Sequence, residues 1–338
     1  MTSATQAKEL HRSALVVDGT SFFCEGWNDR LEIAGVTALQ MTVPWVVEGA
    51  RAAIGRIEEY YELVRREPRL DFVTDLADVQ RMKDEDRVGF IIGCQDGSIL
   101  EADTGLVEVF WRLGMRAIQL TYNARNLLGD GCLEPENAGL SQLGRRMIAE
   151  FNRVGMQLDL SHVGERTTLD AIDASSRPVI FSHSNPITRA PSPRNVTDEQ
   201  IKKCAARGGV IGATPFAPGN WTGGDKAPDI DDFVGHVEYI ADLVGIDHVA
   251  FGTVSEATPG AYPVELRAWL GRTYPESSSR FKEVHPDVAT SAGLESMEGL
   301  PAVTAKLLER EWPEEDIRKF LGGNLLRVYD ENWDSSEI

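Results

Sequence analysis

Two histidines each follow an apolar run that has the length and composition of a buried β-strand. The first run covers residues 156–162 (MQLDLSH) and ends in His162, and the second covers residues 178–183 (PVIFSH) and ends in His183. Imidazoles at the ends of neighbouring parallel strands can share one metal ion or exchange protons with a substrate. We therefore predict a common functional site at His162 and His183, with catalytic and metal-binding roles.

Polar side chains also follow two earlier apolar runs. Gln95 comes after residues 88–93, and Tyr122 and Asn123 come after residues 115–121. If these runs are strands of the same sheet, their carboxyl ends meet at one edge and their side chains join the histidines. We predict catalytic roles for Gln95 and Tyr122, and substrate-binding roles for Tyr122 and Asn123.

The elements that must position these residues are short, β-branched apolar runs that alternate with amphipathic helical patterns. Eight strand-like runs occur, at residues 14–18, 35–42, 88–93, 115–121, 155–161, 178–183, 209–214 and 248–253. Helical patterns occupy residues 46–66, 106–113, 140–154, 167–175, 198–206 and 231–244, and Thr197 with Gln200 predicts a capped start at 198. Eight such repeats predict an α/β fold, a (β/α)8 TIM barrel with its site at the carboxyl ends of the strands.

The chain is predicted to form a single barrel domain over residues 1–338. No internal repeat or Gly/Ser-rich linker divides it, and a polar and aromatic insertion at about 258–287 follows the eighth run. C-terminal helices are predicted near 297–310 and 314–321. These segments would lie outside the barrel repeats.

Composition narrows the class of partner. The formal net charge of −19 repels phosphate backbones and anionic membranes, so we expect no nucleic-acid or membrane partner and a small-molecule substrate instead. No apolar segment approaches the ~20 residues that span a bilayer, and no leader-like segment opens the sequence, so a cytoplasmic protein is expected. The four widely spaced cysteines indicate free thiols and no zinc ribbon.

Several separated motifs together resemble the membrane dipeptidase family, peptidase family M19. They are DLSH at 159–162, FSHS at 181–184, Arg194-Asn195 followed by Asp198, QLTYN at 119–123, GGNLLRV at 322–328, and the opening Leu10-His11 and Val17-Asp18-Gly19. The resemblance runs from about residue 8 to residue 329. It implies a barrel of the metallo-dependent hydrolase type, two zinc ions bridged by a glutamate, hydrolysis of dipeptides by a metal-bridging hydroxide, and a homodimer.

Matching motif by motif, the resemblance gives roles to individual residues. His162 and His183 match the histidines that hold the second zinc ion. Arg194 matches the arginine that binds the substrate, a role that suits a guanidinium facing a carboxylate. Tyr122 stands where the family has a substrate-binding histidine.

The metal ligands, however, depart from the family pattern. Thr20 and Phe22 replace the histidine and aspartate of the first zinc site, Gln95 replaces the bridging glutamate, and Val254 replaces a further aspartate. A divalent cation needs anionic or imidazole ligands to compensate for lost water. We therefore expect no binuclear zinc centre, and at most one weakly bound zinc ion, or none, on His162 and His183.

Three functions remain open. The favoured one is an M19-like hydrolase or lyase with a degenerate metal site, which uses histidine acid/base or single-metal chemistry on a small, carboxylate-bearing amide or amino-acid derivative. The second is a genuine dipeptidase whose zinc site is rearranged with replacement acids from among Glu25, Asp29, Asp96 and Glu256. The third is a binding protein without catalysis.

Overall fold

Eight parallel strands form a nearly closed barrel, as the sequence predicts. The computed structural model describes residues 3–21, 28–43, 49–254, 271–277 and 279–333. Around the barrel the strands follow chain order: β1 Val17–Ser21, β2 Ala38–Thr42, β4 Val88–Cys94, β5 Met115–Gln119, β6 Gln157–Asp159, β7 Ile180–Phe181, β8 Val210–Ala213 and β9 Val249–Phe251. Each of them overlaps one predicted run.

One strand was not predicted. β3, Leu70–Phe72, pairs in parallel with β4 at Val88–Phe90 and lies off the path around the barrel. With only three residues it is too short to carry a recognisable alternation of apolar and polar side chains. The sequence pattern therefore identifies the barrel strands and misses this accessory one.

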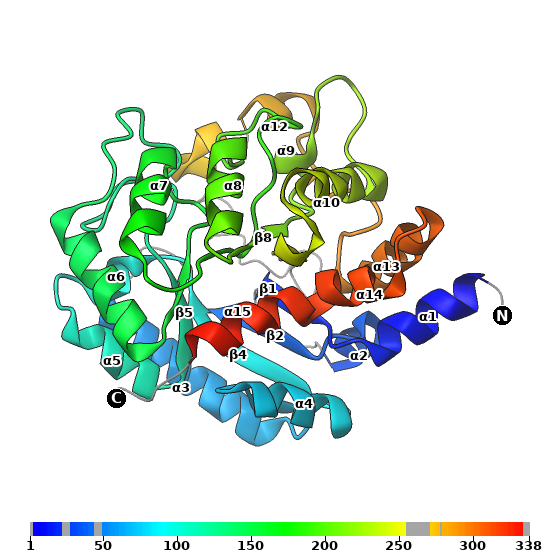
Figure 1. Ribbon diagram of the computed structural model, residues 1–338, viewed down its shortest axis with the longest axis horizontal. Coiled ribbons are helices and arrows are strands. Elements are labelled where there is room, and N and C mark those ends of the chain that lie inside the picture. Colours follow the sequence, from blue (N-terminus) through cyan, green and yellow to red (C-terminus); the bar gives the residue numbers. More distant parts are fainter. Residues whose placement is uncertain (1–2, 22–27, 44–48, 255–270, 278, 334–338) are drawn as a thin grey trace.

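Helices surround the strands on the outside (Figure 1). The helices between barrel strands are α2 Asn28–Ala34, α3 Ala50–Arg66, α4 Leu76–Asp84, α5 Gly105–Arg112, α6 Gln142–Val154, α7 Glu165–Ala174, α8 Asp198–Ala206, α9 Ala217–Asn220 and α10 Ile230–Val244. The predicted cap of α8 is confirmed, because the Gln200 backbone N–H donates to Thr197 Oγ1 and the Thr197 N–H donates to Gln200 Oε1. Outside these repeats lie α1 Ser3–Ser13, α12 Ser279–Val284, α13 Leu300–Glu309, α14 Glu314–Arg318 and α15 Asn324–Asn332.

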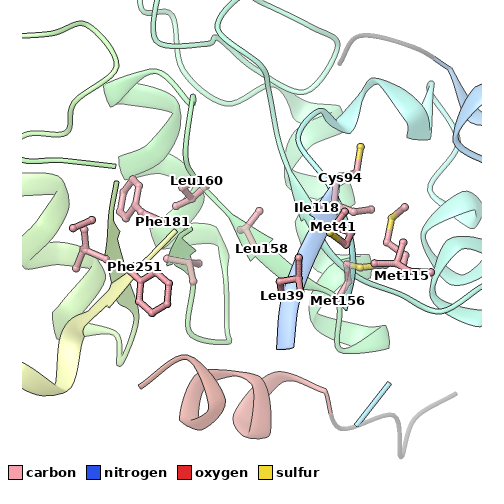
Figure 2. Close-up of a cluster of buried hydrophobic side chains, with 14 of the residues drawn as sticks. Leu39, Met41, Cys94, Met115, Ile118, Met156, Leu158, Leu160, Phe181 and Phe251 are labelled. Carbon is pink, nitrogen blue, oxygen red and sulfur yellow. The ribbon is translucent and has the colours of Figure 1, made fainter. Parts of the chain in front are cut away.

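Alternate residues of each strand face opposite sides of the barrel wall. The outward residues, among them Leu39, Met41, Ile118 and Leu158, belong to the apolar cluster that also contains the inner faces of the helices (Figure 2). The residues between them, such as Gln40 of β2, face the barrel axis. The outer layer thus supplies the main core, and the inner layer is left free to carry polar groups.

The end of the barrel opposite the strand carboxyl ends is closed by α15. Tyr329 and Leu325 of this helix pack with the inward residues Val17, Ile180 and Val210 in a second apolar cluster. Figure 1 shows α15 lying across the ring of strands. The apolar plug leaves the carboxyl ends of the strands as the polar end of the barrel.

A buried aspartate joins β1 to β9, where no ladder hydrogen bonds close the ring. Asp18 accepts hydrogen bonds from the Thr253 backbone N–H at 2.8 Å, the Thr253 hydroxyl at 2.5 Å and the Thr20 N–H at 3.2 Å. The Val254 N–H donates in turn to the Thr20 carbonyl at 3.0 Å. Two bonds from Thr253 to the Asp18 side chain and one backbone bond therefore complete the closure between the first and last strands.

The predicted insertion at 258–287 is described only in part, since residues 258–270 and 278 lie outside the described structure. The described portion contains α12. The described residues contain no helix that is both long enough and apolar enough to cross a membrane. The single-domain organisation stays a prediction.

Candidate active site

The two predicted histidines meet at the carboxyl ends of β6 and β7. His162 Nε2 and His183 Nε2 lie 2.8 Å apart, which is hydrogen-bond distance. Both rings are buried, and the rings stand edge to face with centroids 4.8 Å apart. One of the two facing nitrogens must carry a proton and the other a lone pair, because two lone pairs would repel.

A chain of hydrogen bonds fixes which nitrogen carries the proton. His162 Nδ1 faces the amide oxygen of Asn123 at 2.7 Å, and an oxygen acceptor there requires a proton on Nδ1. Neutral His162 therefore accepts at Nε2, and His183 donates from its Nε2. His183 Nδ1 then accepts from the hydroxyl of Ser182 at 2.7 Å. Because this hydroxyl has one hydrogen, the arrangement requires a proton on the Asp159 carboxyl facing Ser182 Oγ, and burial raises the pKa of Asp159.

Asp159 anchors the far end of this chain. Its carboxyl oxygens contact the Ser182 hydroxyl at 2.5 Å and accept the backbone N–H groups of Ser161 and Ser182, each at 3.0 Å. This is the pattern that Asp18 makes between β1 and β9. Asp159 thus ties β6 to β7 and sets the relative position of the residues that follow them, which is a supporting role and not that of a metal ligand.

The backbone at His162 and Asn123 is held in the left-handed region, with φ of 66° and 55°. This conformation is unfavourable for residues other than glycine and persists only where the surroundings enforce it. The loop at 132–133 does so, because the Cys132 N–H donates to the His162 carbonyl and the Leu133 N–H donates to the Asn123 carbonyl, each at 2.8 Å. The hydrogen-bonded pair of side chains is therefore built in at a conformational cost.

Arg194 supplies positive charge beside the histidines. Its side chain is 7% exposed, its Nη1 has no hydrogen-bond partner, and among the described residues no carboxylate forms an ion pair with it. Burial lowers the pKa of both His162 and His183 well below the usual value, and the Arg194 charge lowers both further. Both rings are therefore neutral near pH 7, and Arg194 is free to bind an anion.

Tyr122 covers the histidine pair. Its ring stacks on that of His162 with centroids 4.0 Å apart, and Tyr274 packs edge to face on Tyr122 at 5.7 Å. Burial raises the pKa of Tyr122, so its hydroxyl stays protonated. The ring limits water access to His162 and fixes the plane of the imidazole.

Gln95 lies at the end of β4, which only β5 separates from β6, the strand that leads to His162. Its amide nitrogen is 3.4 Å from the hydroxyl of Thr20, and its buried amide oxygen has no partner. The structure thus places Gln95 beside one of the residues that stand at family metal positions.

Two residues near the site were not singled out from the sequence. The thiol of Cys132 donates to Asn123 Oδ1 at 3.3 Å and also interacts with Arg194, and Tyr274 contacts Tyr122. Both belong to segments outside the predicted strands, so no strand-end pattern could have identified them. The Ser-His doublets, in contrast, were a sequence signal for Ser182.

Fold and site together define the class of protein. An amidohydrolase from Pseudomonas aeruginosa has the same barrel, with a TM-score of 0.88 and 34% identity over 97% of this chain and 99% of that one. A metallopeptidase from Rhodobacter sphaeroides, solved with a phosphinate mimic of the dipeptide L-Ala-D-Ala, shares the fold at a TM-score of 0.78 and 20% identity, covering 95% of this chain and 99% of that one. The protein therefore has the (β/α)8 barrel of metallo-dependent hydrolases.

The sequence profile of membrane dipeptidase (peptidase family M19) matches residues 5–266 and 286–337, so the chain belongs to that family. A dipeptidase of Claviceps purpurea is 29% identical over 275 residues, which are 81% of this chain and 56% of that protein. The chain thus spans little more than half the length of this relative.

The family implies bound zinc. Whether a zinc ion fits at the barrel mouth depends on the donor atoms that the residues there supply. Within the part of the chain that the structure describes, no three His, Cys, Asp or Glu side chains lie close enough to hold a metal ion. Two histidine nitrogens on one tetrahedral zinc ion stand ~3.3 Å apart, whereas those of His162 and His183 are 2.8 Å apart. The described residues fit a hydrogen-bonded pair better than a zinc site.

Of the four acids considered as replacement ligands, Asp96 is the one with a described side chain. It caps the turn that follows Gln95, and it accepts hydrogen bonds from the Ser98 N–H and hydroxyl and from the Asn126 amide. All three donors contact the same oxygen, Oδ1, which is thus occupied by protein donors. The predicted candidates Glu25, Asp29 and Glu256, and Phe22 at a family ligand position, have side chains outside the described structure.

Proposed function

We propose that the protein is a hydrolase of the membrane dipeptidase family that acts on a small, carboxylate-bearing amide or amino-acid derivative by histidine acid/base chemistry at a degenerate metal site. The observation that carries this proposal is the direct Nε2 to Nε2 contact of His162 and His183, 2.8 Å long, beside the guanidinium of Arg194, whose Nη1 has no hydrogen-bond partner. A lyase acting through the same pair is a variant of this proposal.

The histidine pair offers an acceptor and a donor at one place. His162 Nε2 takes a proton from the water molecule that attacks the amide carbonyl, and the imidazolium so formed gives that proton to the leaving nitrogen. His183 Nε2–H then donates again to the neutral His162 Nε2, which restores the starting state. Water is added across the C–N bond, so atoms and charges balance.

Substrate placement follows from the same geometry. Arg194 binds the carboxylate through its unpartnered Nη1, since guanidinium–carboxylate bonds are strong in a buried setting. Asn123 and Tyr122 flank His162 and position the polar group of the substrate. Gln95 contributes its free amide oxygen.

A zinc dipeptidase with a rearranged site is the second candidate, and the dipeptidases among the relatives favour it. A binding protein without catalysis is the third. We further propose a homodimer, by analogy with the family, and a cytoplasmic location.

The test compares His162→Asn and His183→Asn with the wild type on dipeptides and N-blocked amino acids, each with and without chelator. We expect chelator-insensitive turnover that falls by about 100-fold or more in either variant. Cys204→Ser, at a buried thiol that contacts the Val179 and Val210 carbonyls, is the control for general damage to the barrel.

Turnover that chelator abolishes and zinc restores supports the second candidate. Unchanged turnover in both histidine variants eliminates the acid/base role, and no turnover on any substrate supports the third candidate.

A further inference from the structure

The inner wall of the barrel carries a group of hydrogen-bond acceptors without partners, on three neighbouring strands. We call it the acceptor wall, and it consists of Gln40 and Thr42 on β2, Gln95 at the end of β4, and Gln119 and Thr121 at the end of β5. The side-chain oxygen of each is buried and has no hydrogen-bond partner. None of the five side chains is charged.

Strand alternation and local contacts place these side chains on the same face. The residues next to them along the strands, including Leu39, Met41 and Ile118, belong to the apolar cluster on the outer face of the sheet (Figure 2). Gln40 lies over Gly93 of β4, where an added Cβ would come within 2.7 Å of its side chain. The Gln119 amide nitrogen donates to the Gln95 backbone carbonyl at 3.0 Å, so its oxygen must point the other way. The wall is continuous from β2 to β5.

Unpartnered buried oxygens lower the stability of the folded protein unless a ligand or ordered water donates hydrogen bonds to them. Amide and hydroxyl oxygens take N–H or O–H donors. Five of them on one wall match a group that presents several donors at once, such as a carboxamide or ureido group. The wall therefore has the chemistry of a binding surface for donor groups.

The charges around the mouth decide between a neutral and a cationic donor group. The described buried acids at this end of the barrel each already accept hydrogen bonds from protein donors, and they are Asp18, Asp96, Asp130 and Asp159. Arg194, in contrast, has an unpartnered nitrogen and no described ion pair. A buried ammonium would lose its hydration without gaining, among the described residues, a carboxylate free of protein donors, and Arg194 would also repel it. A neutral donor group avoids both costs.

We infer that the acceptor wall is a subsite for the neutral, N–H-rich end of a carboxylic acid, so that the protein selects N-carbamoyl or other N-blocked amino acids over peptides with a free ammonium group. The inference rests on the proposed function in one respect, the binding of the substrate carboxylate by Arg194. It concerns the binding of the substrate and does not depend on which residues catalyse the reaction.

The experiment measures binding, by calorimetry in chelator-containing buffer. The probes are N-carbamoyl-alanine and glycyl-alanine of the same alanine enantiomer, which share the carboxylate end and differ in the charge of the donor end. We expect the wild type to bind the neutral probe at least about tenfold more tightly, because only the ammonium must be desolvated without a counter-charge. Equal or tighter binding of glycyl-alanine, or no binding of either probe at millimolar concentration, overturns the inference.

A charge variant of the wall sharpens the test. Gln95→Glu places a carboxylate in the wall and is expected to reverse the preference toward glycyl-alanine. Gln80→Glu is the matched control, since Gln80 is exposed on α4 and its side chain contacts Asp84, away from the mouth. An unchanged preference in folded Gln95→Glu overturns the assignment of the wall, and the wild-type comparison decides the inference if that variant does not fold. Binding preference without any turnover contradicts the proposed reaction and leaves this subsite intact.

Discussion

Arg194 is the residue for which function and stability make opposite demands. A buried guanidinium with no described ion pair is unfavourable in the free protein, yet it is the natural partner of a substrate carboxylate. Such a conflict is typical of a residue kept for binding.

Replacing Arg194 by methionine should therefore separate the two effects. We expect Arg194→Met to raise the free energy of unfolding by about 1 kcal/mol and to weaken binding of N-carbamoyl-alanine by about 100-fold. Thermal unfolding and calorimetry measure the two quantities. The amide of the same ligand, which lacks the carboxylate, should bind wild type and variant alike, and an equal loss with both ligands would contradict a carboxylate-binding role.

At the level of strands, the barrel wall depends on close backbone contacts around Ser182. An added Cβ at Gly252 would come within 2.1 Å of the Ser182 carbonyl oxygen, and one at Gly212 within 2.2 Å of the same atom. No side-chain movement relieves a clash with backbone. The glycines of β8 and of the β9 end therefore set the spacing of the strands that carry His183.

Gly252→Ala should destabilise the protein by about 3 kcal/mol or more, because the strands must move apart. Gly55→Ala is the matched control. Gly55 is exposed in the middle of α3 with no atom within 4 Å of an added Cβ, so alanine there should stabilise by about 0.5–1 kcal/mol. Urea denaturation measures both, and a Gly252→Ala protein of wild-type stability would refute the packing argument.

The joint between β1 and β9 makes stability depend on pH. Burial is the largest influence on Asp18 and raises its pKa to about 7, against the hydrogen bonds from Thr253 and Thr20 that lower it. A carboxyl whose pKa is higher in the folded than in the unfolded state stabilises fully below about pH 4, and this contribution is lost as pH rises through 7.

We therefore expect the wild type to lose roughly 4 kcal/mol of unfolding free energy relative to Asp18→Asn between pH 4 and pH 8. Asparagine keeps a neutral acceptor at this position and should remove the pH dependence. Asp242→Asn, on the exposed side of α10, controls for the loss of one acid. A constant difference between wild type and Asp18→Asn across this pH range would show that Asp18 titrates as in the unfolded chain.

For the whole molecule, the metal-ligating side chains at the barrel mouth predict that the stability of the fold does not depend on zinc. The described residues offer His162 and His183 and no third charged or thiol ligand. We expect well under two zinc ions per chain in purified protein and a melting temperature that chelator leaves unchanged. Two tightly held zinc ions, removed only with loss of stability, would return the second candidate, a zinc dipeptidase, to first place.

Much of the fold could be predicted because its signals are local. The eight barrel strands were predicted from β-branched runs that alternate with helical patterns, and the start of α8 was predicted from the capping residues Thr197 and Gln200. β3 was missed because three residues are too few to show a pattern. The start of the first strand was placed at residue 14, whereas β1 begins at Val17, because the apolar run includes residues that precede the sheet.

The sequence by itself determined that histidines stand at the ends of two strands, since residue identity and strand-end position are local properties. By the family resemblance it also predicts that metal ligands are replaced at Thr20, Gln95 and Val254. Only the tertiary structure decided that His162 and His183 contact each other directly and that Gln40 and Gln119 join Gln95 on one inner wall. Those contacts depend on strand register and barrel closure, which bring together residues dozens of positions apart along the chain.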